Sequence, residues 1–147
     1  MTVVVFDGTS LAVDSHSSDG KAKTPATKVW FHNGNKNVLL TGAGHLSSIL
    51  EVKDWFERDG SVDDYPKCQQ GPRQCVFIVL ARHAIYRFES SPHAIEMTGP
   101  FAYGAGAEFA YGALHMGATA EQAVEAAITY SPYCFGKPVV YSIEEEV

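Results

Sequence analysis

Short apolar runs separated by turn signals fill the first forty residues, and this pattern predicts strands. The run from Val3 to Phe6 is apolar and rich in β-branched residues. Asp7-Gly8 gives a hairpin turn signal, and Ser10 to Val13 is interpreted as the return strand, which ends at Asp14. The rest of this segment predicts a polar loop over 15–25, strands over 28–32 and 37–41, and a turn over 33–35. We therefore expect two antiparallel hairpins here.

The spacing of the apolar residues changes after Gly44. Between residues 46 and 56 they recur at helical intervals, which predicts a helix over 45–58 that Asp59-Gly60 ends. Residues 61–73 are polar and contain prolines, so they predict a loop. The remaining sequence predicts strands over 75–81, 84–89, 95–98 and 138–143, and helices over 104–116 and from 119 to about 130.

This order of elements indicates an α+β fold, with two packed sheets and helix layers outside them. The length of 147 residues fits a single domain, and a hydrophobic share of 46% is enough for a packed core. The net charge of −6 argues against nucleic acid or an anionic membrane surface as a partner, because both attract a basic face.

Apolar runs, the N-terminal residues and the cysteine count indicate where in the cell the protein is located. No run approaches the ~20 apolar residues of a membrane-spanning helix, and the N-terminus has no signal peptide pattern. Three cysteines, an odd number, fit a reducing compartment, so we expect a cytoplasmic protein. The run from Glu144 to Glu146 is interpreted as a solvated tail.

Thr2 directly follows the initiator Met1, and this position gives it a chemical opportunity. Removal of Met1 would leave a residue that carries a hydroxyl and a free α-amine on neighbouring atoms. An α-amine has a pKa of about 7.7–8.0, and a nearby positive charge lowers that pKa and frees the base. The amine could then take the proton of the hydroxyl directly or through one water. If Met1 stays, this mechanism fails.

Three supports for such a nucleophile occur in the first half of the chain. Lys28 begins a predicted strand and could supply the positive charge, and Asp14 ends a strand and could orient that lysine. Gly42-Ala43-Gly44 lies between a strand and a helix, where backbone N–H groups can bind an oxyanion. Each residue also has an ordinary structural explanation: an edge charge, a loop cap or a tight turn.

Four stretches together carry a resemblance to a known family. They are TVVVFDGTSLAVDS, ATKVW, LLTGAG and GAGAEFAYGALHMGATAEQAVEAA. In this order and spacing the chain resembles the proteasome β-type N-terminal nucleophile (Ntn) hydrolases over almost its whole length. The resemblance is closest to the HslV peptidases of bacteria and to related subunits carried by some phages.

The resemblance implies a fold, an activity and a set of roles. The fold would be a four-layer αββα sandwich, and the activity would be hydrolysis of peptide bonds through an acyl-enzyme on Thr2. Lys28 would tune the amine, Asp14 would orient Lys28, and the Gly44 N–H would form the oxyanion hole. An extended peptide would bind near Ser18, Gly42 and Gly44, and His45 could line its pocket or could simply begin the helix.

The resemblance also implies partners. We expect a homo-oligomeric ring, a polypeptide substrate and an AAA+ ATPase unfoldase that feeds the ring. No cofactor and no metal are expected for the reaction.

The sequence departs from the family pattern at two supporting positions. A serine of the family corresponds to Ala105, and a second aspartate corresponds to Ser131. The loop over 61–73 also stands where the family has a helix. These departures favour an alternative, a catalytically inactive assembly or binding subunit on the same fold. A small-molecule amidase is a third hypothesis, because other Ntn enzymes cleave amides.

Other sequence patterns give weaker support for a function. VLLTGAGHLSSIL is similar to the start of a dinucleotide-binding unit, but no convincing second strand ends in an acid at the required distance. Cys68, Cys75 and His83 lack the close paired spacing of a zinc site. The tyrosines near the C-terminus are interpreted as core and subunit contacts; they are Tyr103, Tyr111, Tyr130, Tyr133 and Tyr141.

Overall fold

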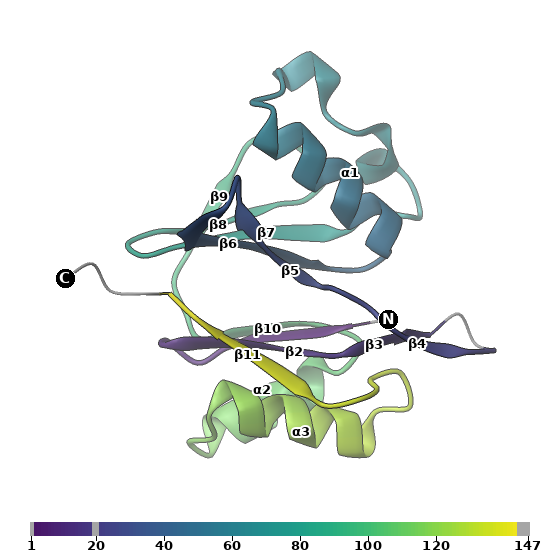
Figure 1. The fold of residues 1–147 in the computed structure, drawn as a ribbon, viewed down its shortest axis with the longest axis vertical. Coiled ribbons are helices and arrows are strands. Elements are labelled where there is room, and N and C mark those ends of the chain that lie inside the picture. Colours follow the sequence, from purple (N-terminus) through teal and green to yellow (C-terminus); the bar gives the residue numbers. More distant parts are fainter. Residues whose placement is uncertain (1, 19–20, 144–147) are drawn as a thin grey trace. The chain divides into compact units, whose positions relative to one another are not determined.

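The computed structural model describes residues 2–18 and 21–143 of the chain (Figure 1). Met1 and the run from Glu144 to Glu146 lie outside the described residues. Within the described residues there are eleven strands, three α-helices and two 3₁₀ helices, and every paired strand is antiparallel. The expected mixture of helices and antiparallel strands is therefore confirmed.

The chain divides into two compact units. The first unit combines Met1–Lys28 with Gly99–Ser142, and the second combines Val29–Thr98 with Ile143–Val147. The first unit thus joins two segments that are distant in the sequence. The expectation of a single domain over the whole chain stays a prediction.

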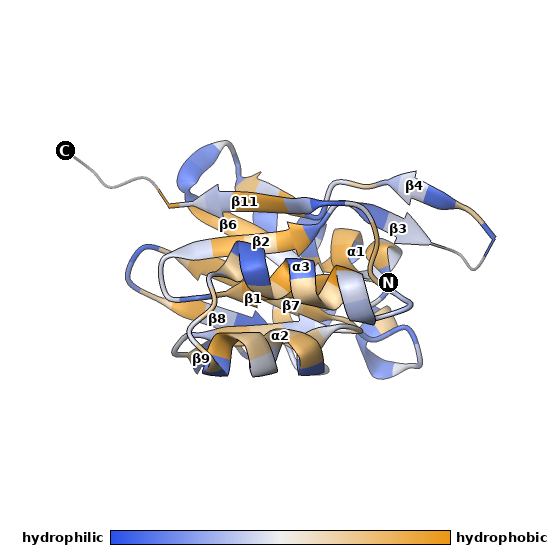
Figure 2. Cartoon of the chain, turned by 90° about the horizontal axis from the view of Figure 1, so that it is seen from below, coloured by the Kyte–Doolittle hydropathy of each residue, from blue (hydrophilic) through white to orange (hydrophobic). Residues whose placement is uncertain are grey.

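The first unit is built on a four-stranded sheet with the order β10-β1-β2-β11. Its strands are β1 (Val3–Phe6), β2 (Ser10–Asp14), β10 (Phe101–Gly104) and β11 (Pro138–Ser142). The hairpin predicted from Asp7-Gly8 is confirmed, with Val4 paired to Val13. Strands β1 and β2 are buried at every residue except the half-buried Ser10, whereas β10 and β11 contain exposed positions, and both β1 and β2 carry orange, hydrophobic colour in Figure 2. They therefore form its buried centre.

Helices α2 (Ala107–His115) and α3 (Ala120–Tyr130) cover one face of this sheet (Figure 1). The shared core consists of small side chains, which allow α3 to approach the strands closely; it includes Val3, Val5, Ala12, Ala123, Val124 and Ala127. The predicted start of α3 is confirmed, because Thr119 and Gln122 form a reciprocal capping box there.

Two expectations about the first unit are corrected. Residues 15–25 are not only a loop, since β3 (His16–Ser18) and β4 (Lys23–Pro25) form a small two-stranded sheet. Residues 101–104 form strand β10 against β1, so α2 begins three residues later than predicted. All three strands are short and depend on pairing with distant or polar neighbours, which hydrophobic periodicity does not report.

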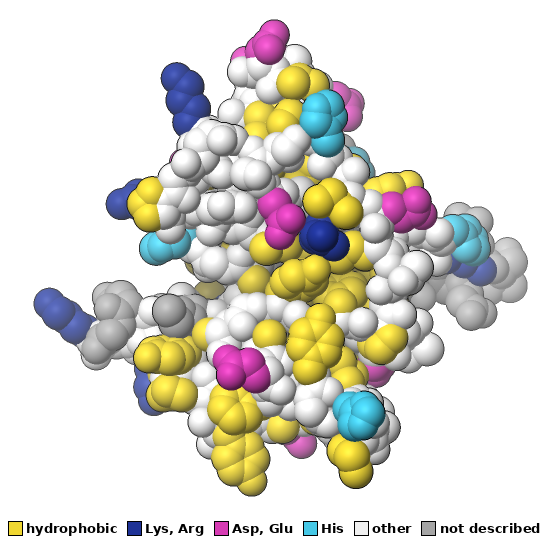
Figure 3. Space-filling view, turned by 180° about the vertical axis from the view of Figure 1, so that it is seen from behind, with side chains coloured by type: hydrophobic (Ala, Val, Ile, Leu, Met, Phe, Trp, Pro, Cys, Tyr) yellow, Lys and Arg dark blue, Asp and Glu magenta, His cyan; other side chains and the backbone are white. Residues whose placement is uncertain are grey.

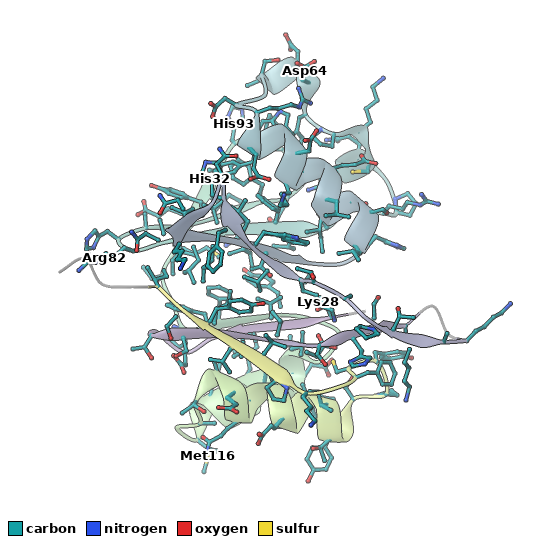
Figure 4. The ribbon with its side chains drawn as sticks, viewed as in Figure 1. Lys28, His32, Asp64, Arg82, His93 and Met116 are labelled. Carbon is teal, nitrogen blue, oxygen red and sulfur yellow. The ribbon has the colours of Figure 1, made fainter. Side chains whose placement is uncertain are left out.

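The outer surface of α2 and α3 carries large apolar side chains (Figure 3). The rings of Phe109 and Tyr130 stack with centroids 6.2 Å apart, and both are exposed. Met116, labelled in Figure 4, is 84% exposed at the end of α2. Tyr111 and Tyr133 are also exposed, so Tyr111, Tyr130 and Tyr133 are not core residues, and their interpretation as subunit contacts stays a prediction. Aromatic residues on a helix surface look like core residues when burial is unknown.

The second unit is a five-stranded sheet with the order β5-β6-β7-β8-β9, packed against one long helix. Its elements are β5 (Val29–His32), β6 (Asn35–Ala43), α1 (Leu46–Glu57), β7 (Val76–Ala81), β8 (Ile85–Phe88) and β9 (Ile95–Met97). The predicted helix and strands of this segment are confirmed to within a few residues. The core between α1 and the sheet is aromatic, with Trp55 against Tyr65 and Phe88.

The segment predicted as a loop over 61–73 contains two short 3₁₀ helices, η1 (Val62–Asp64) and η2 (Lys67–Gln70). These single turns are too short to produce a periodic apolar pattern. Among the described residues, none of the helices has the length and apolar character that crossing a membrane would require.

Candidate active site

Three side chains of the first unit meet at the end of the β1–β2 hairpin. Thr2 directly precedes β1, Asp14 is the last residue of β2, and Lys28, labelled in Figure 4, directly precedes β5. The Thr2 Oγ1 donates to Asp14 Oδ1 at 3.0 Å, and Lys28 Nζ donates to the same oxygen at 2.8 Å. We refer to these residues as the Thr2–Asp14–Lys28 cluster.

The Asp14 carboxylate is the centre of this cluster. It is completely buried, and besides Thr2 and Lys28 it accepts hydrogen bonds from two backbone groups. The Val3 N–H donates to Oδ1 at 3.0 Å, and the Phe135 N–H donates to Oδ2 at 3.2 Å. A buried carboxylate is strongly unfavourable unless it is paired and hydrogen-bonded, and here both conditions hold. These four hydrogen bonds therefore fix the position of the Asp14 carboxylate.

Lys28 is the buried positive charge of the cluster, with 6% of its surface exposed. Its Nζ also donates to the His16 carbonyl at 2.7 Å. Burial lowers the pKa of Lys28, and the neighbouring Asp14 charge raises it without cancelling the effect of burial. Lys28 therefore gives up its proton more readily than an exposed lysine does, while it still places a positive charge beside Thr2.

The backbone of Thr2 is fixed from the opposite side. Its carbonyl accepts a hydrogen bond from the Ala105 N–H at 2.9 Å, directly after the β1–β10 ladder ends at Gly104. Thr2 is thus held by its backbone at Ala105 and by its hydroxyl at Asp14. This arrangement gives the hydroxyl a defined orientation.

The segment after α3 completes the surroundings of Asp14. The Phe135 carbonyl accepts from the His16 N–H at 3.2 Å, while the Phe135 N–H binds Asp14 as described above. Cys134 lies buried beside them, and burial, followed by the Asp14 charge, raises the pKa of its thiol. No sequence motif points to this segment, because backbone groups are the same in every residue type except proline.

The two positions that depart from the family pattern both lie in the first unit. Ala105 provides its backbone N–H to Thr2, but its methyl side chain offers no hydrogen bond. Ser131 ends α3, is buried, and its hydroxyl accepts from the Tyr133 N–H at 3.2 Å. The hydroxyl of Ser131 thus helps to order the turn that leads to Phe135.

The residues expected to contact substrate lie in different places. Ser18 is half-buried in β3 and pairs with Lys23, within the first unit. Gly42, Gly44 and His45 belong to the second unit, at the end of β6 and the start of α1. Gly42 is buried, whereas Gly44 and His45 are exposed. The expected roles of all four residues toward a substrate stay predictions.

Cysteines and histidines are the usual ligands of a zinc site. Cys68, Cys75 and Cys134 are all free thiols. Over residues 2–18 and 21–143, no group of three or more histidine, cysteine or acidic side chains is placed to hold a metal ion.

Comparison with known proteins shows the fold. No protein-family model matches the chain, and no curated protein matches it either. Among solved structures, the chain is similar to eukaryotic HslV from Trypanosoma brucei, with 17% identity, a TM-score of 0.71, and coverage of 99% of this chain and 100% of that one.

Two structures of BPH from Thiobacillus denitrificans give the same picture. The complex of BPH with epoxomicin has 18% identity and a TM-score of 0.67, covering 99% of this chain and 100% of that one. BPH alone has 15% identity and a TM-score of 0.65, with 99% of each chain covered. The chain therefore has an HslV-like fold over its whole length, and the resemblance in the sequence motifs is confirmed at the level of the fold.

Proposed function

We propose that this protein is an N-terminal threonine peptidase that hydrolyses peptide bonds through an acyl-enzyme on Thr2. The observation that carries the proposal is the hydrogen bond from the Thr2 hydroxyl to the buried Asp14–Lys28 pair. A threonine without a chemical role would not need a buried ion pair at its side chain. The HslV-like fold supports the same assignment.

The proposed reaction begins once Met1 has been removed. The free α-amine of Thr2 takes the hydroxyl proton, and Oγ1 attacks the carbonyl carbon of the scissile peptide bond. The protonated amine then gives its proton to the leaving amine as the C–N bond breaks, which leaves an ester on Thr2. Water, activated by the same amine, hydrolyses the ester and restores the hydroxyl. Lys28 lowers the pKa of the α-amine by its charge, and Asp14 fixes the position of Lys28.

The proposal extends to the whole assembly. It includes a four-layer αββα sandwich, a homo-oligomeric ring, a polypeptide substrate, an AAA+ ATPase unfoldase as partner and a cytoplasmic location. It assigns the Gly44 N–H to the oxyanion hole, and Ser18, Gly42 and His45 to the bound peptide. Gly44 is exposed and adopts a φ of +122° just before α1, which supports its role as a donor.

The test uses the intact mass of the purified protein before and after treatment with epoxomicin, the compound present in one BPH structure. Its epoxyketone carries two electrophilic carbons, which suit a residue that has both a hydroxyl and a free amine. We expect a mass without Met1, one covalent adduct on Thr2, and peptidase activity that disappears in the Thr2→Ala variant. Thr129→Ala, which changes an exposed threonine of α3, is the control and should retain both the covalent adduct and the peptidase activity. Peptidase activity in Thr2→Ala would refute the proposal.

Ala105 supports a second candidate, an inactive assembly or binding subunit. At this family position the chain provides a backbone N–H and a methyl group, and no side-chain hydroxyl. This candidate predicts that Met1 is retained, that epoxomicin forms no adduct, and that the oligomer still assembles. The same mass measurement, combined with size-exclusion chromatography, separates the two candidates.

A further inference from the structure

The turn that carries Gly44 rests on the start of β7 in the second unit. The β6–β7 ladder ends with the pair Ala43 and Val76, and Gly44 then leaves it with a φ of +122°. A Cβ atom on Gly44 would lie 3.0 Å from Cys75 Cα and 3.1 Å from Cys75 Cβ. A Cβ on Gly42 would lie 2.6 Å from the Val76 carbonyl oxygen. The direction of the Gly44 N–H therefore depends on where Cys75 is held.

The side chain of Gln69 holds the Cys75 backbone by both of its polar groups. The Cys75 N–H donates to Gln69 Oε1 at 2.8 Å, and Gln69 Nε2 donates to the Cys75 carbonyl at 3.1 Å. The same Nε2 also donates to the Glu89 carbonyl at 2.8 Å. Gln69 is completely buried, so each of these bonds replaces contacts that water would otherwise make.

The position of Gln69 explains why a carboxamide is used. The β7–β8 ladder ends with Phe77 paired to Phe88, so Cys75 and Glu89 lie beyond its last pair. The carboxamide has one acceptor and two donors, which match the backbone groups of these two residues. Gln69 thus continues the hydrogen bonding of the sheet where the neighbouring strand has separated.

We propose that Gln69 is a positioning residue for the Gly44 N–H. It fixes Cys75 from one side, and Gly44 packs against Cys75 from the other. This inference rests on the proposed function, because it matters for catalysis only if Gly44 stabilises an oxyanion. Gln69 does not touch the reacting atoms, so it acts through the geometry of the turn.

A misplaced oxyanion donor weakens the transition state more than the bound substrate. Loss of such a donor reduces kcat by about 100-fold to 1,000-fold in other hydrolases, so a displaced donor should cost at least about 10-fold. We therefore expect Gln69→Met, which keeps the length of the side chain and removes its polar atoms, to lower kcat at least about 10-fold with KM little changed.

Gln70→Met is the matched control. Gln70 lies in the same 3₁₀ helix, and its side chain donates to the Ser90 carbonyl at an exposed site. This variant removes a glutamine carboxamide of the same segment without touching Cys75. Its kcat and KM should equal those of the wild type.

Hydrogen exchange gives a readout that does not require activity. In the full-length protein, backbone amides of residues 42–46 should exchange faster in Gln69→Met than in the wild type or in Gln70→Met. If the wild type proves to have no peptidase activity, the proposed function fails, but the exchange measurement still tests the link from Gln69 to Gly44. Unchanged exchange at 42–46 in Gln69→Met would overturn that link.

Gln69→Glu provides the rescue experiment, and it also serves if Gln69→Met does not fold. Burial raises the pKa of the introduced carboxyl, and its protonated form keeps the acceptor for the Cys75 N–H and one of the two donors of the carboxamide. The kcat of Gln69→Glu relative to wild type should therefore rise as the pH is lowered. A ratio that does not change with pH, or a kcat equal to wild type throughout, would contradict the positioning role.

Discussion

The β1–β2 hairpin carries an aspartate at each end, and the structure uses the two carboxylates differently. At the turn, Asp7 Oδ1 accepts from the backbone of Thr9 and Ser10, and its Oδ2 accepts from the Ala120 N–H at 2.8 Å. Asp7 is half-buried and has only neutral donors among these partners. At the open end, Asp14 is completely buried and binds a lysine and a threonine hydroxyl.

This difference separates a carboxylate that accepts hydrogen bonds at a turn from a buried carboxylate that binds a lysine and a threonine hydroxyl. Asp7 ties the turn to the first residue of α3, where backbone N–H groups have no partner within the helix. Asp14 instead concentrates a buried charge pair beside one hydroxyl, which helix capping would not require. A buried lysine whose pKa is lowered, as that of Lys28 is, is typical of functional sites. The comparison predicts that changes at the two ends will affect different properties.

The largest effect is expected from Lys28→Met. This variant leaves the Asp14 carboxylate buried without its counter-charge, which costs about 3–5 kcal/mol of stability for a buried pair. It also removes the charge that, in the proposed mechanism, lowers the pKa of the Thr2 amine, so peptidase activity should fall at least about 100-fold. Urea unfolding and peptide hydrolysis measure the two effects. Wild-type activity in Lys28→Met would show that the pair is only structural.

Asp14→Asn tests whether the two charges act as a unit. The single variant should be unstable, because it leaves the Lys28 ammonium buried without a counter-charge. The double variant with Lys28→Met removes both charges, and its loss of stability should be smaller than the sum of the single losses by at least about 1 kcal/mol. Unfolding free energies of the four proteins give this coupling. Additive losses would mean that Asp14 and Lys28 contribute independently.

Asp7→Ala should affect stability and leave the reaction alone. Loss of the cap at Ala120 is expected to cost about 1–2 kcal/mol of unfolding free energy, with peptide hydrolysis unchanged in the folded protein. Asp54→Ala, at an exposed position of α1, is the control and should change stability by less than about 0.5 kcal/mol. A marked loss of activity in Asp7→Ala would remove the distinction between the two ends of the hairpin.

The smallest effect is the pH dependence of the Asp7 contribution. Burial opposes ionisation of Asp7, but hydrogen bonds from Ala120, Ser10 and Thr9 outweigh it, so the pKa lies below the usual value. A lowered pKa stabilises the fold above the pKa of the unfolded state, and this stabilisation is lost as the pH falls through the folded value. The difference in urea midpoint between wild type and Asp7→Asn should therefore shrink between pH 7 and pH 3. A constant difference would contradict this assignment.

Local features of the sequence were sufficient for most of the fold. The turn signal Asp7-Gly8 predicted the first hairpin, and the cap at Thr119 predicted the start of α3. Strand β10 and the β3–β4 pair were not predicted, because their formation depends on neighbours outside each short segment. The same holds for the site, where Thr2, Asp14 and Lys28 could be named from their chemistry and from the family resemblance.

Phe135 and Gln69 could not be named in this way. The Phe135 N–H reaches Asp14 across a separation of 121 residues, and any residue type at position 135 except proline would provide that donor. The role of Gln69 was also not predictable from the sequence, because a polar residue in a polar segment gives no sign that it is buried against Cys75.

The sequence by itself determined the local elements and the inventory of reactive groups, because turn signals, caps and apolar spacing act over a few residues. Only the tertiary structure decided which groups meet. The meeting of Thr2, Lys28 and the Phe135 backbone at one carboxylate depends on strand pairing and on the return of the chain after α3. Contacts between distant segments follow from packing of the whole unit, and no short stretch of sequence encodes them.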